Sequence, residues 1–209
     1  LIGVDRRTTK DLDTTVRGFT LTHDKATEVF SAICAIDVDD DLSFELLRTE
    51  DIRETDEYPG IRVFLRARYG TLSVPLTVDV TTGDRIIPDA IAYEYPFVFD
   101  EGSARIMAYP LETVLAEKLE TILVRNVATT RIRDFYDIYE LWRVKGDTVD
   151  RSIFGKALAA TCEKRNSWKA VEHRKKAINA MRKDDGLERQ WEAYVSKHSY
   201  AIGISFQET

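Results

Sequence analysis

A β-hairpin is predicted by the stretch Ile61-Arg62-Val63-Phe64-Leu65-Arg66-Ala67-Arg68-Tyr69-Gly70-Thr71-Leu72-Ser73-Val74-Pro75-Leu76-Thr77-Val78-Asp79-Val80. Apolar and polar residues alternate on both sides of Gly70, and a period of two is typical of half-buried strands. Glycine at this place supports the tight turn that joins two such strands. The stretch therefore predicts two neighbouring strands, 61–69 and 72–80, in one sheet.

Three earlier segments predict two more strands and a helix. Residues 11–22 are rich in Thr with short apolar alternations, and residues 42–46 alternate, so both segments favour strands. Residues 24–37 carry apolar side chains at helical spacing and predict an amphipathic helix opened by Asp24. We therefore expect a sheet with a flanking helix in this part of the chain.

From Leu111 onward the pattern is helical. The predicted helices lie near 110–126, 130–144, 150–163, 167–182 and 185–198, with a loop at Lys145-Gly146-Asp147. Strands followed by helices indicate an α+β fold. We expect a sheet domain over residues 1–104 and a helical domain over residues 105–209.

The composition is that of a globular protein, with 44% hydrophobic residues. The longest apolar runs fall short of the roughly 20 residues that span a bilayer, and the start of the chain lacks a signal-peptide pattern, so we expect a cytoplasmic protein. Cys34 and Cys162 lie in helix-like segments and indicate core thiols rather than a disulfide. The three histidines are scattered, which disfavours a zinc enzyme.

Charge is divided unevenly along the chain, whose net charge is -6. Residues 1–104 hold 11 Lys and Arg against 21 Asp and Glu, a balance of -10, whereas residues 105–209 hold 19 against 15, a balance of +4. An acidic part suits a cation and a basic part suits phosphates. The balance fits a nucleotide or RNA substrate without establishing one.

Three aspartates are candidates for an acidic metal site. The segment Arg7-Thr8-Thr9-Lys10-Asp11-Leu12-Asp13 places two acids where a strand would project both on one side. Asp79 lies between two valines in the predicted strand 72–80. One interpretation is that these acids face solvent, in a turn and on a half-buried strand. The other is that the strands are neighbours and the three carboxylates share a cation such as Mg2+, which offsets their repulsion.

Charged residues also occur on the apolar faces of two predicted helices. Lys118 falls near the middle of the apolar arc of helix 110–126, whereas Glu120 lies outside that arc. In helix 130–144 the apolar face contains Arg131 and Asp134, with Asp137 at its edge. Arg133, Tyr136 and Glu140 point the other way. The charges could pair internally, Lys118 with Asp134, or line a cleft in which Lys or Arg holds a triphosphate.

Residues 164–183 are strongly basic, with Glu172 as the single acid and Trp168 interleaved. The basic residues are Lys164, Arg165, Lys169, Arg174, Lys175, Lys176, Arg182 and Lys183. Such a segment could follow the phosphates of RNA, or it could be the solvated face of an amphipathic helix.

Several segments carry motifs in a recognisable order. They are Arg7-x-Thr9-x-Asp11-x-Asp13, Leu76-Thr77-Val78-Asp79-Val80-Thr81-Thr82-Gly83-Asp84, Tyr109-Pro110-Leu111-Glu112-Thr113-Val114-Leu115-Ala116-Glu117-Lys118-Leu119 with Arg125, Thr130-Arg131-Ile132-Arg133-Asp134-Phe135-Tyr136-Asp137-Ile138, and Trp191 with Tyr194 and Ser205-Phe206. Together they resemble the AbiEii-like nucleotidyltransferase toxins of bacterial type IV toxin–antitoxin and abortive-infection systems. The resemblance covers nearly the whole chain, and its middle portion is specific.

The resemblance implies a DNA polymerase β-like nucleotidyltransferase fold, in which a mixed sheet carries the metal acids and a helical domain closes the cleft. It implies that Asp11, Asp13 and Asp79 hold Mg2+ or Mn2+. Carried over by position, the catalytic residues are Asp79, Lys118, Asp134 and Asp137, and the nucleotide-binding residues are Arg7, Thr9, Lys118 and Arg131. Asp134 and Asp137 would serve the active site directly or orient its basic residues.

The implied reaction is attack by an acceptor hydroxyl on the α-phosphate of an NTP, with release of pyrophosphate. Family members are associated with guanosine or pyrimidine nucleotides and, in some cases, with transfer to tRNA 3′ ends. The acceptor expected here is RNA, such as tRNA, or a protein hydroxyl. A toxin of this kind implies a cognate antitoxin encoded nearby.

The chain departs from the family before its first acids. In this fold a helix opened by a Gly-Gly or Gly-Ser turn precedes the Asp-x-Asp, and its backbone amides bind the triphosphate. Only ten residues precede Asp11, and Gly3 is too close to the acids to be that turn. Either the helix lies upstream of Leu1, or the protein lacks it. The second case predicts a catalytically silent nucleotide- or antitoxin-binding module. A further alternative, based on the basic residues of 164–183, is an RNA-binding accessory protein.

Overall fold

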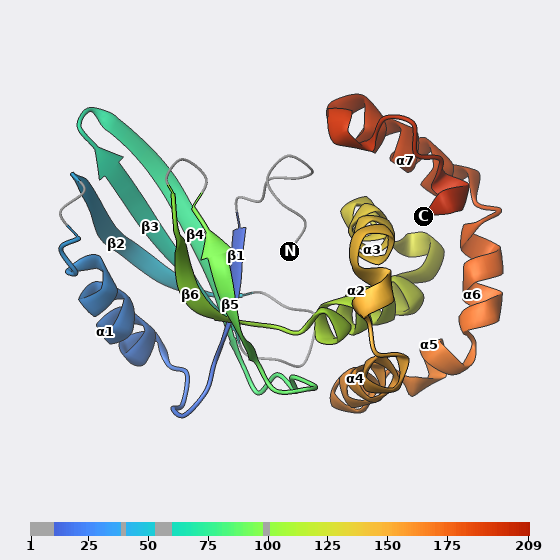
Figure 1. Cartoon of the computed structure of the whole chain (residues 1–209), viewed down its shortest axis with the longest axis horizontal. Coiled ribbons are helices and arrows are strands. Elements are labelled where there is room, and N and C mark those ends of the chain that lie inside the picture. Colours follow the sequence, from blue (N-terminus) through green and yellow to red (C-terminus); the bar gives the residue numbers. More distant parts are fainter. Residues whose placement is uncertain (1–10, 39–40, 53–59, 98–100) are drawn as a thin grey trace. The chain divides into compact units, whose positions relative to one another are not determined.

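The computed structural model describes residues 11–38, 41–52, 60–97 and 101–209, with Asp11 described by its backbone alone (Figure 1). These residues divide into two compact units, one that ends at Asp84 and one from Arg85 to Thr209. The predicted boundary between residues 104 and 105 differs from this division. Residues 85–104, which include much of a β-hairpin, belong to the second unit. The predicted α+β class is confirmed, because a mixed sheet with a flanking helix precedes a helical region.

The first unit contains a four-stranded sheet in the order β1-β4-β3-β2. Its strands are β1 (Asp11–Val16), β2 (Leu42–Asp51), β3 (Gly60–Tyr69) and β4 (Leu72–Thr82). The predicted hairpin is confirmed: Tyr69 pairs with Leu72 across the turn, where Gly70 has a φ of 54°. β2 pairs antiparallel with β3, whereas β1 pairs parallel with β4. The predicted strand 11–22 ends early, because the chain turns at Gly18, which has a φ of 89°.

One face of this sheet is apolar and packs against α1 (His23–Cys34). Its buried residues come from β3 and β4, with Ala26 contributed by the helix: Ile61, Val63, Leu65, Val78 and Val80. Side chains alternate between the two faces of a strand, so the intervening residues belong to the other face. That second face therefore contains Arg62 and Asp79.

Helix α1 begins at His23 and is capped by Thr22, rather than opened by Asp24. The Thr22 hydroxyl accepts a hydrogen bond of 3.1 Å from the backbone N–H of Lys25, which is the role of an N-cap. Asp24 lies in the first turn, where a carboxylate interacts favourably with the helix dipole. The predicted opening residue is thus displaced by two positions.

The second unit holds a β-hairpin and a set of helices. Its strands are β5 (Ile91–Pro96) and β6 (Ser103–Ala108), and its helices are α2 (Leu111–Arg125), α3 (Ile132–Lys145), α4 (Arg151–Lys164), α5 (Trp168–Glu172), α6 (Arg174–Met181) and α7 (Asp185–Lys197). Four of the predicted helices are confirmed. The predicted helix 167–182 is divided at His173, whose backbone N–H and ring nitrogen both contact the Lys169 carbonyl.

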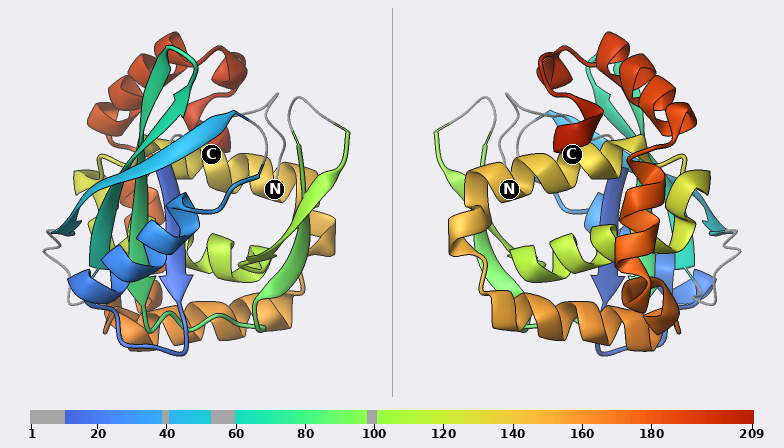
Figure 2. Two further views of the ribbon diagram at one scale, coloured as in Figure 1. Left: turned by 90° about the vertical axis from the view of Figure 1, so that its left-hand side faces the viewer. Right: turned by 90° about the vertical axis from the view of Figure 1, so that its right-hand side faces the viewer.

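The core of the second unit lies between α2, α3, α6 and α7. Figure 2 shows α6 lying along one side of α2 and α3. Tyr136 and Leu187 are fully buried there, and Trp191 donates a hydrogen bond of 2.9 Å to the Ile204 carbonyl. The C-terminal segment thereby joins the core, in which the rings of Phe135 and Phe206 meet edge to face.

The N-cap of α7 gives a stability prediction. Asp184 accepts a hydrogen bond of 2.8 Å from the Leu187 N–H, so Asp184→Ala should lower the free energy of unfolding by about 1 kcal/mol. Urea denaturation measures this loss. Asp185→Ala, in the first turn of the same helix, is the matched control and should cost about half as much. Equal losses in the two variants would mean that the cap bond contributes nothing specific.

Candidate functional site

The predicted acids of the sheet lie on neighbouring strands. The parallel register of β1 and β4 places Asp13 opposite Asp79, and Asp11 opposite Thr77. Residues in register on adjacent strands share a face of the sheet, so Asp13 and Asp79 lie together on the face opposite the α1 core. Arg7 and Thr9, predicted to bind the nucleotide, lie outside the described residues.

Arg62 of β3 binds Asp79 in a two-pronged ion pair that the sequence interpretation missed. Its Nε donates to Asp79 Oδ1 at 2.7 Å and its Nη2 donates to Oδ2 at 2.8 Å. Parallel bonds of this kind are the strong geometry of arginine with a carboxylate. A signal was present, because counting outward from Tyr69 and Leu72 across the turn brings Arg62 opposite Asp79.

Hydroxyl groups tie β1 to β4 close to these acids. Thr15 and Thr81, which are opposite in the register, are hydrogen-bonded through their hydroxyls at 2.7 Å. Both hydroxyls also contact the Asp84 carboxylate, Thr81 at 2.7 Å, and one O–H donates to it while the other is shared between the two threonines. This cross-strand group fixes the end of the β1–β4 pair just beyond Asp13 and Asp79.

The acidic positions fit a divalent cation by their chemistry. Carboxylate oxygens are the hard ligands that Mg2+ takes in proteins. Among the side chains that the structure describes, no group of three or more His, Cys, Asp or Glu residues is close enough together to hold a metal ion. Two carboxylates, Asp13 and Asp79, are described on the shared face, and the backbone of Asp11 lies two residues before Asp13 on β1. Such a set suits an ion that keeps waters in its shell.

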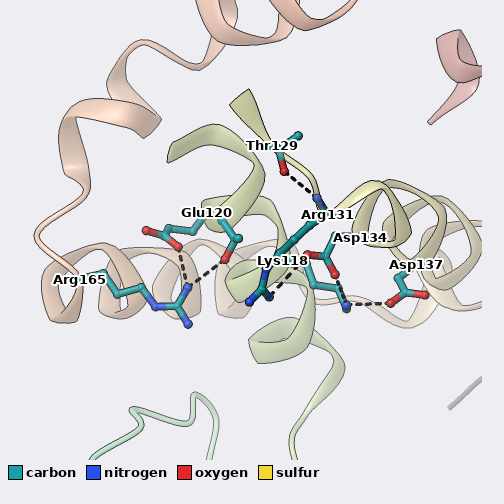
Figure 3. A network of polar contacts seen from close by, with 8 residues as sticks. Lys118, Glu120, Thr129, Arg131, Asp134, Asp137 and Arg165 are labelled. Atoms are coloured by element: carbon teal, nitrogen blue, oxygen red, sulfur yellow. Dashed lines mark hydrogen bonds and ion pairs between the residues drawn. The ribbon is translucent and has the colours of Figure 1, made fainter. Parts of the chain in front are cut away.

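In the helical unit, Lys118 of α2 is held by two carboxylates of α3 (Figure 3). Its Nζ donates to Asp134 Oδ1 at 2.6 Å and to Asp137 Oδ2 at 2.8 Å. The lysine side chain is 23% exposed, whereas the two aspartates are 8% and 5% exposed. The predicted pairing of Lys118 with Asp134 is thus present, and contact of Lys118 with phosphates stays a prediction.

Arg131 lies at the edge of this cluster. Its Nη1 is 4.0 Å from Asp134 Oδ2, and its side chain is 57% exposed. Asp134 and Asp137 lie on one side of α3, because residues three apart share a face, and Arg131 is the N-cap residue of that helix. The structure therefore gathers four of the predicted residues from α2 and α3.

A second buried ion pair was missed from the sequence. Glu120 of α2, expected outside the apolar arc, is buried and accepts from Arg165 Nη1 at 2.7 Å (Figure 3). Tyr136 and Glu140, expected to point away from the core, are also buried. The expectation was wrong because it assumed a single buried face, whereas α2 and α3 are covered from several sides by other helices.

The two thiols are structural. Both cysteines are free, as predicted, and burial raises the pKa of the Cys34 and Cys162 thiols. A raised pKa keeps the thiol protonated at neutral pH and makes it a poor nucleophile. Neither thiol is therefore a candidate for covalent catalysis.

The predicted basic segment forms an exposed surface on α5 and α6. Its exposed basic residues, which we call the α5–α6 basic surface, are Lys169, Arg174, Lys175, Lys176, Arg182 and Lys183. Trp168, at the start of α5, is 46% exposed. Ala177 and Met181 anchor α6 to the core, so the charges lie on the outward side of a packed helix. Arg165 is excluded from this surface because it turns to Glu120.

None of the helices in the described ranges is both long and apolar enough to cross a membrane. A protein-family model described as nucleotidyl transferase AbiEii toxin, type IV TA system, matches residues 1–208. No curated protein matches the chain, and neither does any solved structure.

Proposed function

Because the chain belongs to the AbiEii nucleotidyl transferase toxin family of type IV toxin–antitoxin systems, we propose that it transfers a nucleotidyl group from an NTP to a hydroxyl group of RNA, such as tRNA. The observation that supports this best is the register of β1 and β4, which sets Asp13 beside Asp79. Adjacent carboxylates on one sheet face are suited to a metal-assisted phosphoryl reaction.

In the proposed reaction the RNA hydroxyl oxygen forms a bond to the α-phosphorus of the NTP. The bond between that phosphorus and the bridging oxygen breaks, and pyrophosphate leaves. Asp11, Asp13 and Asp79 would hold divalent cations, Mg2+ or Mn2+, which would supply positive charge to offset the negative charge that develops in the reaction. A carboxylate oxygen of Asp79 accepts the proton of the attacking hydroxyl.

The phosphate groups of the NTP are assigned to basic residues. A lysine ammonium has three N–H donors, and Asp134 and Asp137 account for two of those of Lys118. The third donor, on a side chain that is partly exposed, contacts a phosphate oxygen while the two aspartates orient the ammonium. Arg131, with its more exposed guanidinium, adds a second phosphate contact, and Arg7 and Thr9 are assigned to the same role.

RNA is favoured over a protein as the acceptor because of the α5–α6 basic surface. Among the described residues, its side chains make no ion pair with an acid. Clustered cations of this kind bind the phosphates of a nucleic acid, and an exposed tryptophan such as Trp168 can stack on a base. Both NTPs and tRNA are cytoplasmic, so we place the reaction and a cognate antitoxin in the cytoplasm.

The RNA contact is tested by its salt dependence. Lys175→Gln with Lys176→Gln should lower the slope of log affinity against log salt concentration by about 2, one for each lost phosphate contact. Fluorescence anisotropy of labelled tRNA measures the slope. The matched control is Lys145→Gln with Lys197→Gln, which removes two exposed charges from the last turns of α3 and α7. If both double variants bind tRNA like the wild type, the surface is a solvated helix face.

The reaction itself is tested by incubation with each labelled NTP and total tRNA in the presence of Mg2+. Label should enter RNA with the wild-type protein and should not do so with Asp13→Ala. Label that enters the protein instead would identify a protein acceptor. Binding of a nucleotide or of the antitoxin without any transfer would identify a catalytically silent module of the same family.

A further inference from the structure

We infer that Arg62 competes with a divalent cation for the carboxylate of Asp79. Its guanidinium binds that carboxylate in the metal-free protein. The inference rests on the proposed function, because it takes Asp79 as a metal ligand. It assigns a role to a residue that neither the sequence motifs nor the proposed reaction uses.

The first step is the geometry of the pair. Arg62 engages both carboxylate oxygens of Asp79, at 2.7 and 2.8 Å. The two residues are opposite each other in the β3–β4 register, and Asp13 is opposite Asp79 on the other side. One row across the sheet therefore reads Arg62, Asp79, Asp13. The guanidinium supplies the positive charge that adjacent acids require when a cation is absent.

The second step is competition for the same oxygens. A Mg2+ ion binds a carboxylate oxygen at about 2.0 to 2.1 Å and lies where its positive charge is repelled by a nearby guanidinium. Both Asp79 oxygens already accept hydrogen bonds from Arg62. A cation that takes one of them must displace one prong of the pair and work against the charge of Arg62.

The third step is that Arg62 can release the carboxylate of Asp79. Its side chain is 44% exposed and that of Asp79 is 20% exposed, so the guanidinium can turn to water while the cation neutralises the carboxylate. Water solvates the guanidinium once it separates from Asp79, which lowers the cost of breaking even a two-pronged pair. The Lys118 cluster differs in this respect, since both of its carboxylates are at most 8% exposed. The Arg62 contact is thus the displaceable one of the two.

The consequence is a defined sign for the effect of Arg62 on metal affinity. Removing the guanidinium should tighten divalent cation binding by about tenfold, equal to about 1.4 kcal/mol. A purely structural arginine that positions Asp79 for the metal would have the opposite effect, since its loss would weaken binding. The direction of the change in metal affinity therefore distinguishes an arginine that competes with the metal from one that positions Asp79 for it.

The test is titration of the purified chain with Mn2+, followed by the electron paramagnetic resonance signal of the free ion. Arg62→Met should lower the dissociation constant about tenfold. Arg62→Lys, which keeps the charge but loses the two-pronged geometry, should give a smaller decrease. The matched control is Arg66→Met on the same strand. Arg66 pairs with Glu45 at 3.5 Å, and the Mn2+ affinity of this variant should equal that of the wild type. Thermal unfolding of each variant establishes that it is folded.

Several outcomes overturn the inference: weaker or unchanged Mn2+ binding in Arg62→Met, an equal change in Arg66→Met, or no Mn2+ binding by any of the proteins. If Arg62→Met tightens Mn2+ binding but no NTP is consumed by the wild type, the inference stands and the proposed transfer reaction fails. If RNA is labelled but Arg62→Met binds Mn2+ like the wild type, the reaction stands and the inference fails.

Discussion

We expect Asp13→Asn to lower the rate of nucleotidyl transfer on the order of 10³-fold while leaving the free energy of unfolding nearly unchanged. The amide removes one negative charge and one strong cation ligand from the row that Asp13 forms with Asp79. The substitution should change the free energy of unfolding little, because the Asp13 side chain is exposed and β1 is at the edge of the described sheet. A large loss of activity without loss of stability is the signature of a site residue.

The measurement compares initial rates of label transfer from a saturating NTP with urea denaturation of the same preparations. The matched control is Asp24→Asn, an exposed acid in the first turn of α1 within the same unit. Its transfer rate should stay close to that of the wild type. If Asp13→Asn retained more than a tenth of the wild-type rate, the assignment of Asp13 to a metal would be wrong.

Much of the sheet could be predicted because its main contact is local. The alternation of residues 61–80 and the position of Gly70 define both strands, and the turn sets their register. The pairing of Arg62 with Asp79 follows from that register and could have been predicted by counting. That β1 lies beside β4 was one interpretation of the sequence, but the register of this parallel pair could not be predicted, because it joins segments far apart in sequence and no turn sets its offset.

The charged residues of the helices were only partly predictable. Helical projection found Lys118 and Asp134 on buried faces, because a charge inside an apolar arc is visible in the pattern. It failed for Glu120, which faces Arg165 just after the end of α4. A projection distinguishes one buried side from one exposed side. It carries no information on a helix that several neighbours cover, so the burial of Tyr136 and Glu140 was missed as well.

The hairpin of β5 and β6 was also missed. Its residues include a proline and several exposed apolar side chains, such as Tyr95 and Met107, so they lack the clear alternation of a half-buried strand. The pairing of Ile91 with Ala108 closes this hairpin within the second unit. The pairs between its own two strands therefore stabilise it.

Lys118→Met should have the largest effect on folding, a loss of about 3 kcal/mol in the free energy of unfolding. The substitution leaves Asp134 and Asp137 without their ammonium partner, and both carboxylates are nearly buried. Two desolvated negative charges then lie close together on one side of α3. We expect the low end of the usual range for a broken buried pair, because Lys118 itself is 23% exposed and its charge is partly screened by water.

Urea denaturation of three proteins separates the structural role of Lys118 from its proposed role on phosphates. Lys25→Met breaks an exposed pair of almost the same length, 2.7 Å to Glu28, and should cost less than about 0.5 kcal/mol. Adding Asp134→Asn and Asp137→Asn to Lys118→Met removes the negative charges of both carboxylates. This triple variant should regain most of the lost stability. If this triple variant is stable but does not transfer nucleotide, the lysine or its partners act in the reaction as well as in the fold. A loss below 1 kcal/mol in Lys118→Met would show instead that water already solvates the cluster.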